Sequence, residues 1–154
     1  MAPNPITREG MAKLEKELNR LIKEERTKVI QAIGEARAHG DLSENAEYHA
    51  AKEKQGFIEA RISELQDKIA TSEIVDDSGP YDRCVFGATF TLEHVETGKE
   101  LTYKLVGPFE SAPSEGLLSV ATPIGQAVLG HEEGDEVTVK TPKGPQDYVI
   151  VSIR

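Results

Sequence analysis

Two acidic residues, Asp41 and Glu44, lie three positions apart in a short break between two long, charged stretches that contain no proline. Carboxylate oxygens are ligands that Mg²⁺ prefers, but Mg²⁺ takes about six ligands, so this pair alone would bind the ion poorly. Such a site would be completed by another macromolecule and its phosphate substrate. The chemistry expected of a shared Mg²⁺ of this kind is the activation of water for attack on a phosphodiester.

The same pair also has a purely structural interpretation. An Asp at the N-cap of a helix, followed by a Glu three residues later, satisfies backbone N–H groups at the helix start. Ser43 offers an alternative cap, and Asn45 is expected to cap or brace the turn. His39 and His49 flank the break, but their spacing matches no zinc site. The residues by themselves leave both capping and metal binding open.

The stretches on either side of the break have the periodicity of amphipathic helices. Thr7 is the expected N-cap of the first helix, and the second helix is expected to begin between Leu42 and Asn45 and to run to about Ser72. The apolar stripe of the first helix consists of Met11, Leu14, Leu18, Leu21, Ile22, Val29, Ile33 and Ala36. The stripe predicted for the second helix consists of Ala46, Ala50, Phe57, Ile58, Ile62, Leu65 and Ile69. This pattern predicts an antiparallel coiled coil over residues 1–76, with an acidic tip at about residues 38–45.

The second half of the chain follows a polar linker at residues 77–82 and has a different pattern. Runs rich in β-branched and aromatic residues, punctuated by Gly or Pro, predict strands. These runs are residues 85–92, 101–106, 117–120, 136–140 and 148–153. One short helix fits between them, with Thr122 as N-cap, Pro123 at the first position and Gly130 just past the end. Residues 83–154 are therefore expected to form an antiparallel sheet with one short helix, which puts the chain in the α+β class.

The composition limits the classes of function. The chain has 154 residues, of which 38% are hydrophobic and 29% are charged, as in a soluble protein rather than a disordered or membrane protein. Its formal net charge of -9 argues against wrapping of nucleic acid by a basic surface. Residues 76–154 hold 13 Asp and Glu against 6 Lys and Arg, so the second domain is expected to hold a protein partner. A single cysteine, Cys84, excludes an intramolecular disulfide. No apolar run has the length of a signal peptide core or a membrane span, so we expect a cytoplasmic protein with no membrane partner. We also expect the protein to be a monomer.

Four segments of the chain carry a resemblance to a known family. The segments are Ala32–Arg37, Gly40–Lys52, Val85–Ala88 and Ser119–Gly125. Over nearly its whole length the chain resembles the GreA-type transcript cleavage factors, which are elongation factors of bacterial RNA polymerase. The segment Gly40–Lys52, with the sequence GDLSENAEYHAAK, is the most specific part of this resemblance.

The resemblance implies a function for the tip. The coiled coil of the family enters the secondary channel of the polymerase, where backtracked RNA extrudes its 3′ end. Asp41 and Glu44 match the tip acids that stabilise a second Mg²⁺ in the polymerase active site. The factor would then accelerate the polymerase's own cleavage of nascent RNA and rescue arrested complexes, without being an enzyme itself. Arg37 and Lys52 match basic positions that approach the extruded RNA, and the ring of Tyr48 is suited to stacking on a base.

The resemblance also implies a role for the second domain. This domain is expected to resemble FK506-binding proteins and to dock on the polymerase at the entrance of the secondary channel. Thr122 and Pro123 fall in the segment that makes this contact. Many relatives have Ser where this chain has Thr122, so the hydroxyl is kept and a methyl group is added.

Three other functions compete with this interpretation. An inhibitory channel ligand of the anti-Gre type would share the architecture, but the tip here matches the cleavage-stimulating pattern. A peptidyl-prolyl isomerase, which the second domain suggests, would need a deep pocket lined by aromatic residues, and the chain has no Trp. A coiled-coil adaptor with a capped turn would explain the periodicity but not the acidic tip.

Overall fold

The computed structural model describes residues 3–41 and 44–154, which form two compact units. The hairpin unit is Met11–Thr71, and the sheet unit combines residues 3–10 with Ser72–Arg154. The sequence predicts a helical domain that ends at residue 76. In the structure, strands β1 (Asn4–Ile6) and β2 (Ser72–Ile74), which flank the helices, pair in parallel and belong to the sheet unit. The α+β class is confirmed. No helix among the described residues is long and apolar enough to span a membrane.

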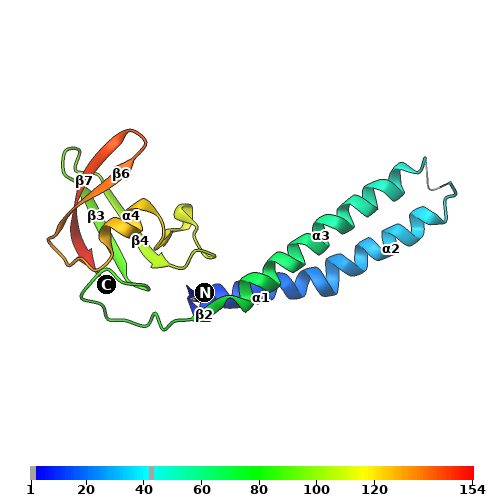
Figure 1. Cartoon of the computed structure of the whole chain (residues 1–154), viewed down its shortest axis with the longest axis horizontal. Helices are drawn as coiled ribbons and strands as arrows, with labels where there is room; N and C mark the ends of the chain where they lie inside the picture. The colour runs from blue at the N-terminus through cyan, green and yellow to red at the C-terminus, as the bar shows by residue number, and fades with distance from the viewer. Residues whose placement is uncertain (1–2, 42–43) are drawn as a thin grey trace. The chain divides into compact units, whose positions relative to one another are not determined.

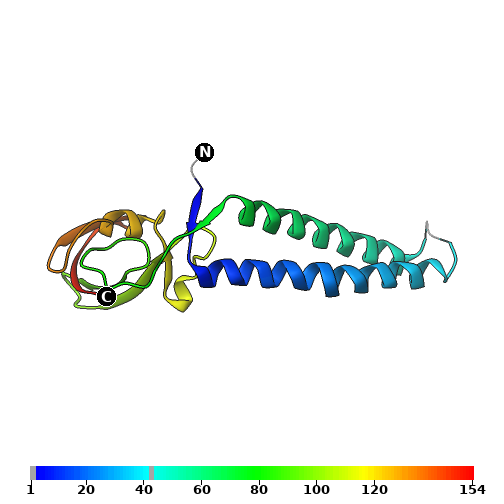
Figure 2. The same ribbon diagram turned by 90° about the horizontal axis from the view of Figure 1, so that it is seen from below.

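The hairpin unit consists of two antiparallel helical arms. The first arm comprises α1 (Arg8–Arg20), the π-helical turn η1 (Leu21–Glu25) and α2 (Arg26–Arg37), and the second arm is α3 (Ala46–Ala70). The two arms run side by side in both cartoon views (Figures 1 and 2). The Oγ1 of Thr7 accepts a hydrogen bond from the Gly10 N–H at 2.9 Å, which confirms the predicted N-cap. The predicted start of the second helix includes Leu42 and Ser43, which lie outside the described residues.

The stripe predicted for the first arm is confirmed at six of its eight positions, and the other two, Leu18 and Ile22, are partly buried. The buried apolar residues of this arm are Met11, Leu14, Leu21, Val29, Ile33 and Ala36. The turn η1 explains a change in their spacing, because Leu14 and Leu21 are seven residues apart whereas Leu21 and Val29 are eight apart. A π-helical turn takes up one additional residue, so the side chains on both sides of it face α3.

The stripe predicted for the second arm is only partly right. Ile58, Ile62 and Leu65 are buried as expected, with Ile69 partly buried. Ala46, Ala50 and Phe57 are exposed, and 68% of Phe57 is accessible to solvent. The inward positions nearer the tip are instead Tyr48, Ala51 and Gln55. They continue the alternating steps of three and four from Ile58 toward the tip, as in a heptad repeat.

The sheet unit contains a five-stranded sheet in the order β5-β4-β3-β7-β6. The strands are β3 (Thr89–His94), β4 (Glu100–Val106), β5 (Leu117–Ser119), β6 (Glu136–Thr141) and β7 (Gly144–Ile153). All five predicted strands are present, but the first begins at Thr89, because residues 86–87 form a turn. The sheet is not purely antiparallel, since β5 pairs with β4 in parallel. A short 3₁₀ helix, η2 (Pro113–Glu115), precedes β5 within the connection between these strands, and a parallel pair cannot be joined by a tight hairpin turn.

One face of this sheet covers the core of the unit, and α4 (Pro123–Val128) packs against it. The buried cluster comprises Cys84, Ala88, Phe90, Leu92, Leu105, Leu118, Val128, Val137, Ile150 and Ile153. Thr122 is the N-cap of α4, Pro123 is its first residue, and Gly130 lies beyond its end with φ of 81°. These three predictions are confirmed.

Candidate functional site

The side chain of Asn45 connects the two arms at the tip of the hairpin by hydrogen bonds. Asn45 is the N-cap of α3, where its Oδ1 accepts a hydrogen bond from the Tyr48 N–H at 3.0 Å. Its Nδ2 donates to the backbone oxygen of Ala36, near the end of α2, at 2.6 Å. Asn45 therefore both caps the turn and braces it, as the sequence predicts.

Asp41 and Glu44 are both exposed and line the same open hollow, which has a volume of about 510 Å³. His39, Asn45, Ala46 and Glu47 also line it. Since α3 begins at Ala46 with Asn45 as its N-cap, neither acid occupies the cap position that the structural interpretation gave to Asp41. Within residues 3–41 and 44–154, no group of three or more His, Cys, Asp or Glu side chains could hold a metal ion. Two carboxylates in one hollow are a donor set that fits part of a Mg²⁺ shell and needs further ligands from outside the chain.

The three residues predicted to approach RNA lie next to this hollow. The guanidinium carbon of Arg37, at the end of α2, lies 5.9 Å from the ring centroid of Tyr48, which is a cation–π distance. The Tyr48 ring also meets the His49 ring edge-on, with centroids 5.6 Å apart. Lys52 is exposed one helical turn beyond Tyr48, and its Nζ donates to the Gln55 Oε1 at 3.1 Å. The structure therefore brings Arg37 and Tyr48 together across the two arms, with Lys52 following on α3.

Ion pairs between the arms hold the hairpin closed below the tip. The guanidinium of Arg26 donates to both carboxylate oxygens of Glu59, at 2.7 and 2.8 Å. Arg61 donates in the same way to Glu17, with both distances 3.0 Å. The hydrogen bond from Arg26 lowers the pKa of Glu59 below its usual value. These pairs are bidentate, a geometry that favours one register of the two arms.

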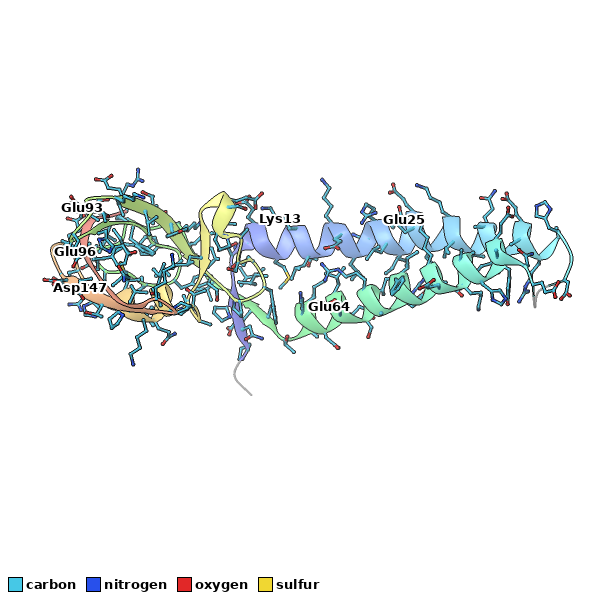
Figure 3. The ribbon with its side chains drawn as sticks, turned by 90° about the horizontal axis from the view of Figure 1, so that it is seen from above. Lys13, Glu25, Glu64, Glu93, Glu96 and Asp147 are labelled. Atoms are coloured by element: carbon cyan, nitrogen blue, oxygen red, sulfur yellow. The ribbon has the colours of Figure 1, made fainter. Side chains whose placement is uncertain are left out.

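Further ion pairs lie along each arm, and two of their acidic members are labelled in Figure 3. Glu64 on α3 accepts from Arg61 and Lys68, each at 3.1 Å. Glu25 on the first arm accepts from Arg20 at 3.3 Å. The pKa of Glu64 is lowered by its hydrogen bonds to Lys68 and Arg61. The sequence pattern gives no sign of the pairs between the arms, because partners more than thirty positions apart have no local spacing signal.

Thr122 and Pro123 belong to the sheet unit. The Thr122 Oγ1 accepts from the Gly125 N–H at 3.1 Å and donates to the Ser119 backbone oxygen at 2.7 Å. Pro123 is exposed at the first position of α4, so its ring is presented to solvent on a capped helix start. The fixed φ of proline suits this position.

The chain matches two family models that together cover most of its length. The model described as "Transcription elongation factor, N-terminal" matches residues 4–74, and the model described as "Transcription elongation factor, GreA/GreB, C-term" matches residues 79–154. Among similar proteins, the transcription elongation factor GreA of Thioalkalivibrio sulfidiphilus is 51% identical over 100% of this chain and 99% of its own length. The protein of the same name from Trichlorobacter lovleyi is 52% identical over 97% of this chain and 96% of its own length. Among solved structures, the GreA factor homolog 1 protein of Thermus thermophilus is 29% identical, with 97% of each chain covered and a TM-score of 0.44.

Proposed function

Because this chain belongs to the GreA/GreB family of transcription elongation factors, we propose that it stimulates the RNA cleavage activity of bacterial RNA polymerase. The hairpin unit enters the secondary channel of the polymerase and carries its tip to the 3′ end of backtracked nascent RNA. Cleavage of that RNA by the polymerase releases the arrested complex. The factor itself is not an enzyme, and it acts in the bacterial cytoplasm, where the polymerase is found.

The observation that carries this proposal is the position of Asp41 and Glu44. Both carboxylates are exposed at the tip of a hairpin of two long helices and line one open hollow. A slender antiparallel hairpin can bring such groups into a narrow cavity of a larger enzyme, which an acidic patch on a flat surface cannot do. Family membership supports the choice of partner, and the exposed position of the two acids at the tip supports their role.

The two acids would hold a Mg²⁺ together with ligands from the polymerase and the RNA phosphate. The ion, when bound, activates water and stabilises charge on the phosphodiester being cleaved. The side chains of Asp41 and Glu44 contribute negative charge and oxygen ligands from one side of the site. Because they provide only part of the shell, the isolated factor is expected to bind Mg²⁺ no more tightly than millimolar.

Arg37, Tyr48 and Lys52 would guide the RNA beside these acids. Arg37 packs over the Tyr48 ring, so its position is restrained while its charge faces solvent. A base can stack on an aromatic ring whatever its identity, which suits a factor that acts on transcripts of any sequence. The cations of Arg37 and Lys52 would attract the phosphates of the extruded strand.

The sheet unit would anchor the factor at the channel entrance. Thr122 and Pro123 lie on the exposed start of α4, which is rigidly capped. This division of labour separates binding from chemistry: loss of the tip acids should leave docking intact, and loss of the docking contact should leave the tip competent.

The test is a cleavage assay on a backtracked bacterial elongation complex that carries labelled RNA and Mg²⁺. The wild type is compared with the isosteric double variant Asp41→Asn/Glu44→Gln. A matched control, Asp67→Asn/Glu53→Gln, makes the same two chemical changes at exposed positions on α3, away from the tip acids. We expect the wild type and the control to accelerate cleavage and the tip variant to lose nearly all of the acceleration. All three proteins should compete equally for the polymerase.

Two outcomes would contradict the proposal. Slower elongation without cleavage by the wild type would identify the chain as an inhibitory ligand of the channel. Equal acceleration by the wild type and the tip variant would mean that Asp41 and Glu44 have no chemical role.

A further inference from the structure

Asn45 occupies a position where one short side chain uses both of its polar atoms. The Tyr48 N–H can only donate, so the atom of Asn45 that faces it at 3.0 Å must be the oxygen. The Ala36 carbonyl can only accept, so the atom that faces it at 2.6 Å must be the amide nitrogen. The orientation of the amide group is therefore determined by its two partners, because the opposite orientation would put two donors together and two acceptors together.

The two hydrogen bonds of Asn45 have different structural roles. The bond from the Tyr48 N–H caps α3, and Ser or Asp would do this equally well. The bond to the Ala36 oxygen instead reaches a carbonyl in the last turn of α2, which also accepts from the His39 N–H at 3.1 Å. Only the second bond ties the end of one arm to the beginning of the other. Capping alone therefore does not explain why the residue here is Asn.

The hydrogen bond from Asn45 to the Ala36 carbonyl joins the two arms close to the two acids. Glu44 is the residue directly before Asn45, and Asp41 lies in the same segment between Ala36 and Asn45. Asn45 also lines the hollow that contains both carboxylates. A constraint at Asn45 thus acts on the backbone that carries Glu44 and on the end of the segment that carries Asp41.

We propose that Asn45 is a positioning residue for the tip acids, acting through its hydrogen bond to the Ala36 carbonyl. The inference rests on the proposed function, since the acids must act on a shared Mg²⁺ for their placement to matter. Residues that orient metal ligands without touching the metal typically contribute about 10- to 100-fold to metal affinity or activity. Asn45 supplies this orientation from within the factor.

The test distinguishes the hydrogen bond to the Ala36 oxygen from the capping bond that accepts from the Tyr48 N–H. Asn45→Ser and Asn45→Asp both keep an oxygen that can accept from the Tyr48 N–H, and both lose the amide nitrogen that donates to Ala36. Asn19→Ser is the matched control, because Asn19 is exposed on the outer side of α1. We expect both Asn45 variants to retain the helix content, melting temperature and polymerase affinity of the wild type. At saturating factor, the rate of stimulated cleavage should fall about tenfold, and the Mg²⁺ concentration for half-maximal cleavage should rise.

A second measurement requires no polymerase and no metal. Backbone order parameters from NMR relaxation of the free factor report the motion of Asp41 and Glu44 on the picosecond to nanosecond timescale. We expect lower order parameters at both residues in Asn45→Ser than in the wild type or in Asn19→Ser.

The outcomes are distinguishable from those of the proposed function. A wild type that does not accelerate cleavage overturns the proposed function, and this inference falls with it. An active wild type with unchanged cleavage rate, Mg²⁺ requirement and order parameters in Asn45→Ser overturns the inference alone. A loss of activity that tracks loss of helix content, with an unchanged Mg²⁺ requirement, also overturns it, because Asn45 would then be only a cap.

Discussion

Glu110 accepts two hydrogen bonds from a single residue, Thr7, which lies 103 positions earlier in the chain. The Oε1 of Glu110 accepts from the Thr7 N–H at 2.8 Å, and the Oε2 accepts from the Thr7 hydroxyl at 2.5 Å. The Gly107 N–H donates to the Oε1 as well, at 3.1 Å. Since Thr7 is also the N-cap of α1, this carboxylate fixes the residue at which the first helix begins.

Removal of this carboxylate should destabilise the sheet unit. Glu110→Ala leaves three donors without their acceptor, and we expect it to lower the free energy of unfolding by about 3 kcal/mol. Glu110→Gln keeps one acceptor oxygen and should cost about 1 kcal/mol. Urea unfolding followed by circular dichroism measures both effects. The control Glu115→Ala changes an exposed glutamate on η2 and should stay within about 0.5 kcal/mol of the wild type. An equally small effect at Glu110 would mean that these hydrogen bonds contribute nothing to stability.

Substitution of alanine for two different glycines should change the stability of the fold in opposite directions. A Cβ at Gly107 would lie 1.7 Å from the backbone oxygen of Pro5, so Gly107→Ala must displace β1 and should cost about 3 kcal/mol. A Cβ at Gly34 would meet nothing within 4 Å, and Gly34 lies inside α2. Gly34→Ala should therefore stabilise the hairpin unit by about 1 kcal/mol. Thermal unfolding of the two variants checks both signs, and a destabilising Gly34→Ala would contradict the open surroundings of this residue.

Low pH should destabilise the hairpin unit because it protonates the carboxylate of Glu59. Its pKa is lowered from 4.5, chiefly by the hydrogen bond from Arg26. A carboxyl group whose pKa is lower in the folded state stabilises the fold above its unfolded pKa, and this contribution disappears as the pH falls through the folded pKa. The stability difference between the wild type and Glu59→Gln should thus be largest near neutral pH and vanish well below pH 4.5. Melting temperatures measured from neutral to acidic pH test this, and high salt should also reduce the difference. A difference that grows in acid would be the opposite of this expectation.

The thiol of Cys84 should be inert in the folded protein. Burial, together with the nearby charge of Asp135, raises its pKa to about 11, and the thiolate is the reactive form. A thiol reagent at pH 8 should therefore modify the native protein far more slowly than the protein in denaturant. Equal rates in both conditions would show that the core around Cys84 opens readily.

The first arm was predictable from its sequence because most of its inward positions hold large apolar residues. Leu14, Leu21, Val29 and Ile33 are all buried, so their spacing alone located the face that packs on α3. The same spacing contains the additional residue of η1, since eight positions separate Leu21 from Val29 where a regular heptad has seven. A hydrophobic pattern thus predicts a helix well when the apolar residues are large.

The tip half of the second arm was not predictable in the same way. Ala46 and Ala50 were assigned to the stripe because they are apolar, yet small side chains gain little from burial and so carry a weak signal. Tyr48 and Gln55, which are not purely apolar, take inward positions and are partly buried there. Phe57 was misplaced because a large aromatic residue next to Ile58 resembles a continuation of the stripe.

Pairings between distant segments had no signal in the sequence. Strands β1 and β2 have three residues each and ordinary composition, so their parallel pairing emerged only from the structure. At the tip, the motif around Asp41 and Glu44 indicated the acids and the cap, whereas the bond from Asn45 to Ala36 depends on how the two arms meet. Local sequence patterns identify helix caps and apolar stripes. Contacts between the two arms can be identified only once the fold is known.

Pro123 should contribute to docking on the polymerase and not to cleavage chemistry. Pro123→Ala removes an exposed ring at the start of α4 while Thr122 continues to cap this helix through the Gly125 N–H. We expect about tenfold weaker binding to the elongation complex, equivalent to 1.4 kcal/mol, with the maximal cleavage rate restored at high factor concentration. The matched control Pro145→Ala makes the same change at an exposed position of β7 and should bind normally. Titration of each variant in the cleavage assay gives the half-saturating concentration and the maximal rate separately. A Pro123→Ala protein that still fails at saturation would place this residue outside the docking contact, as would one that binds as tightly as the control.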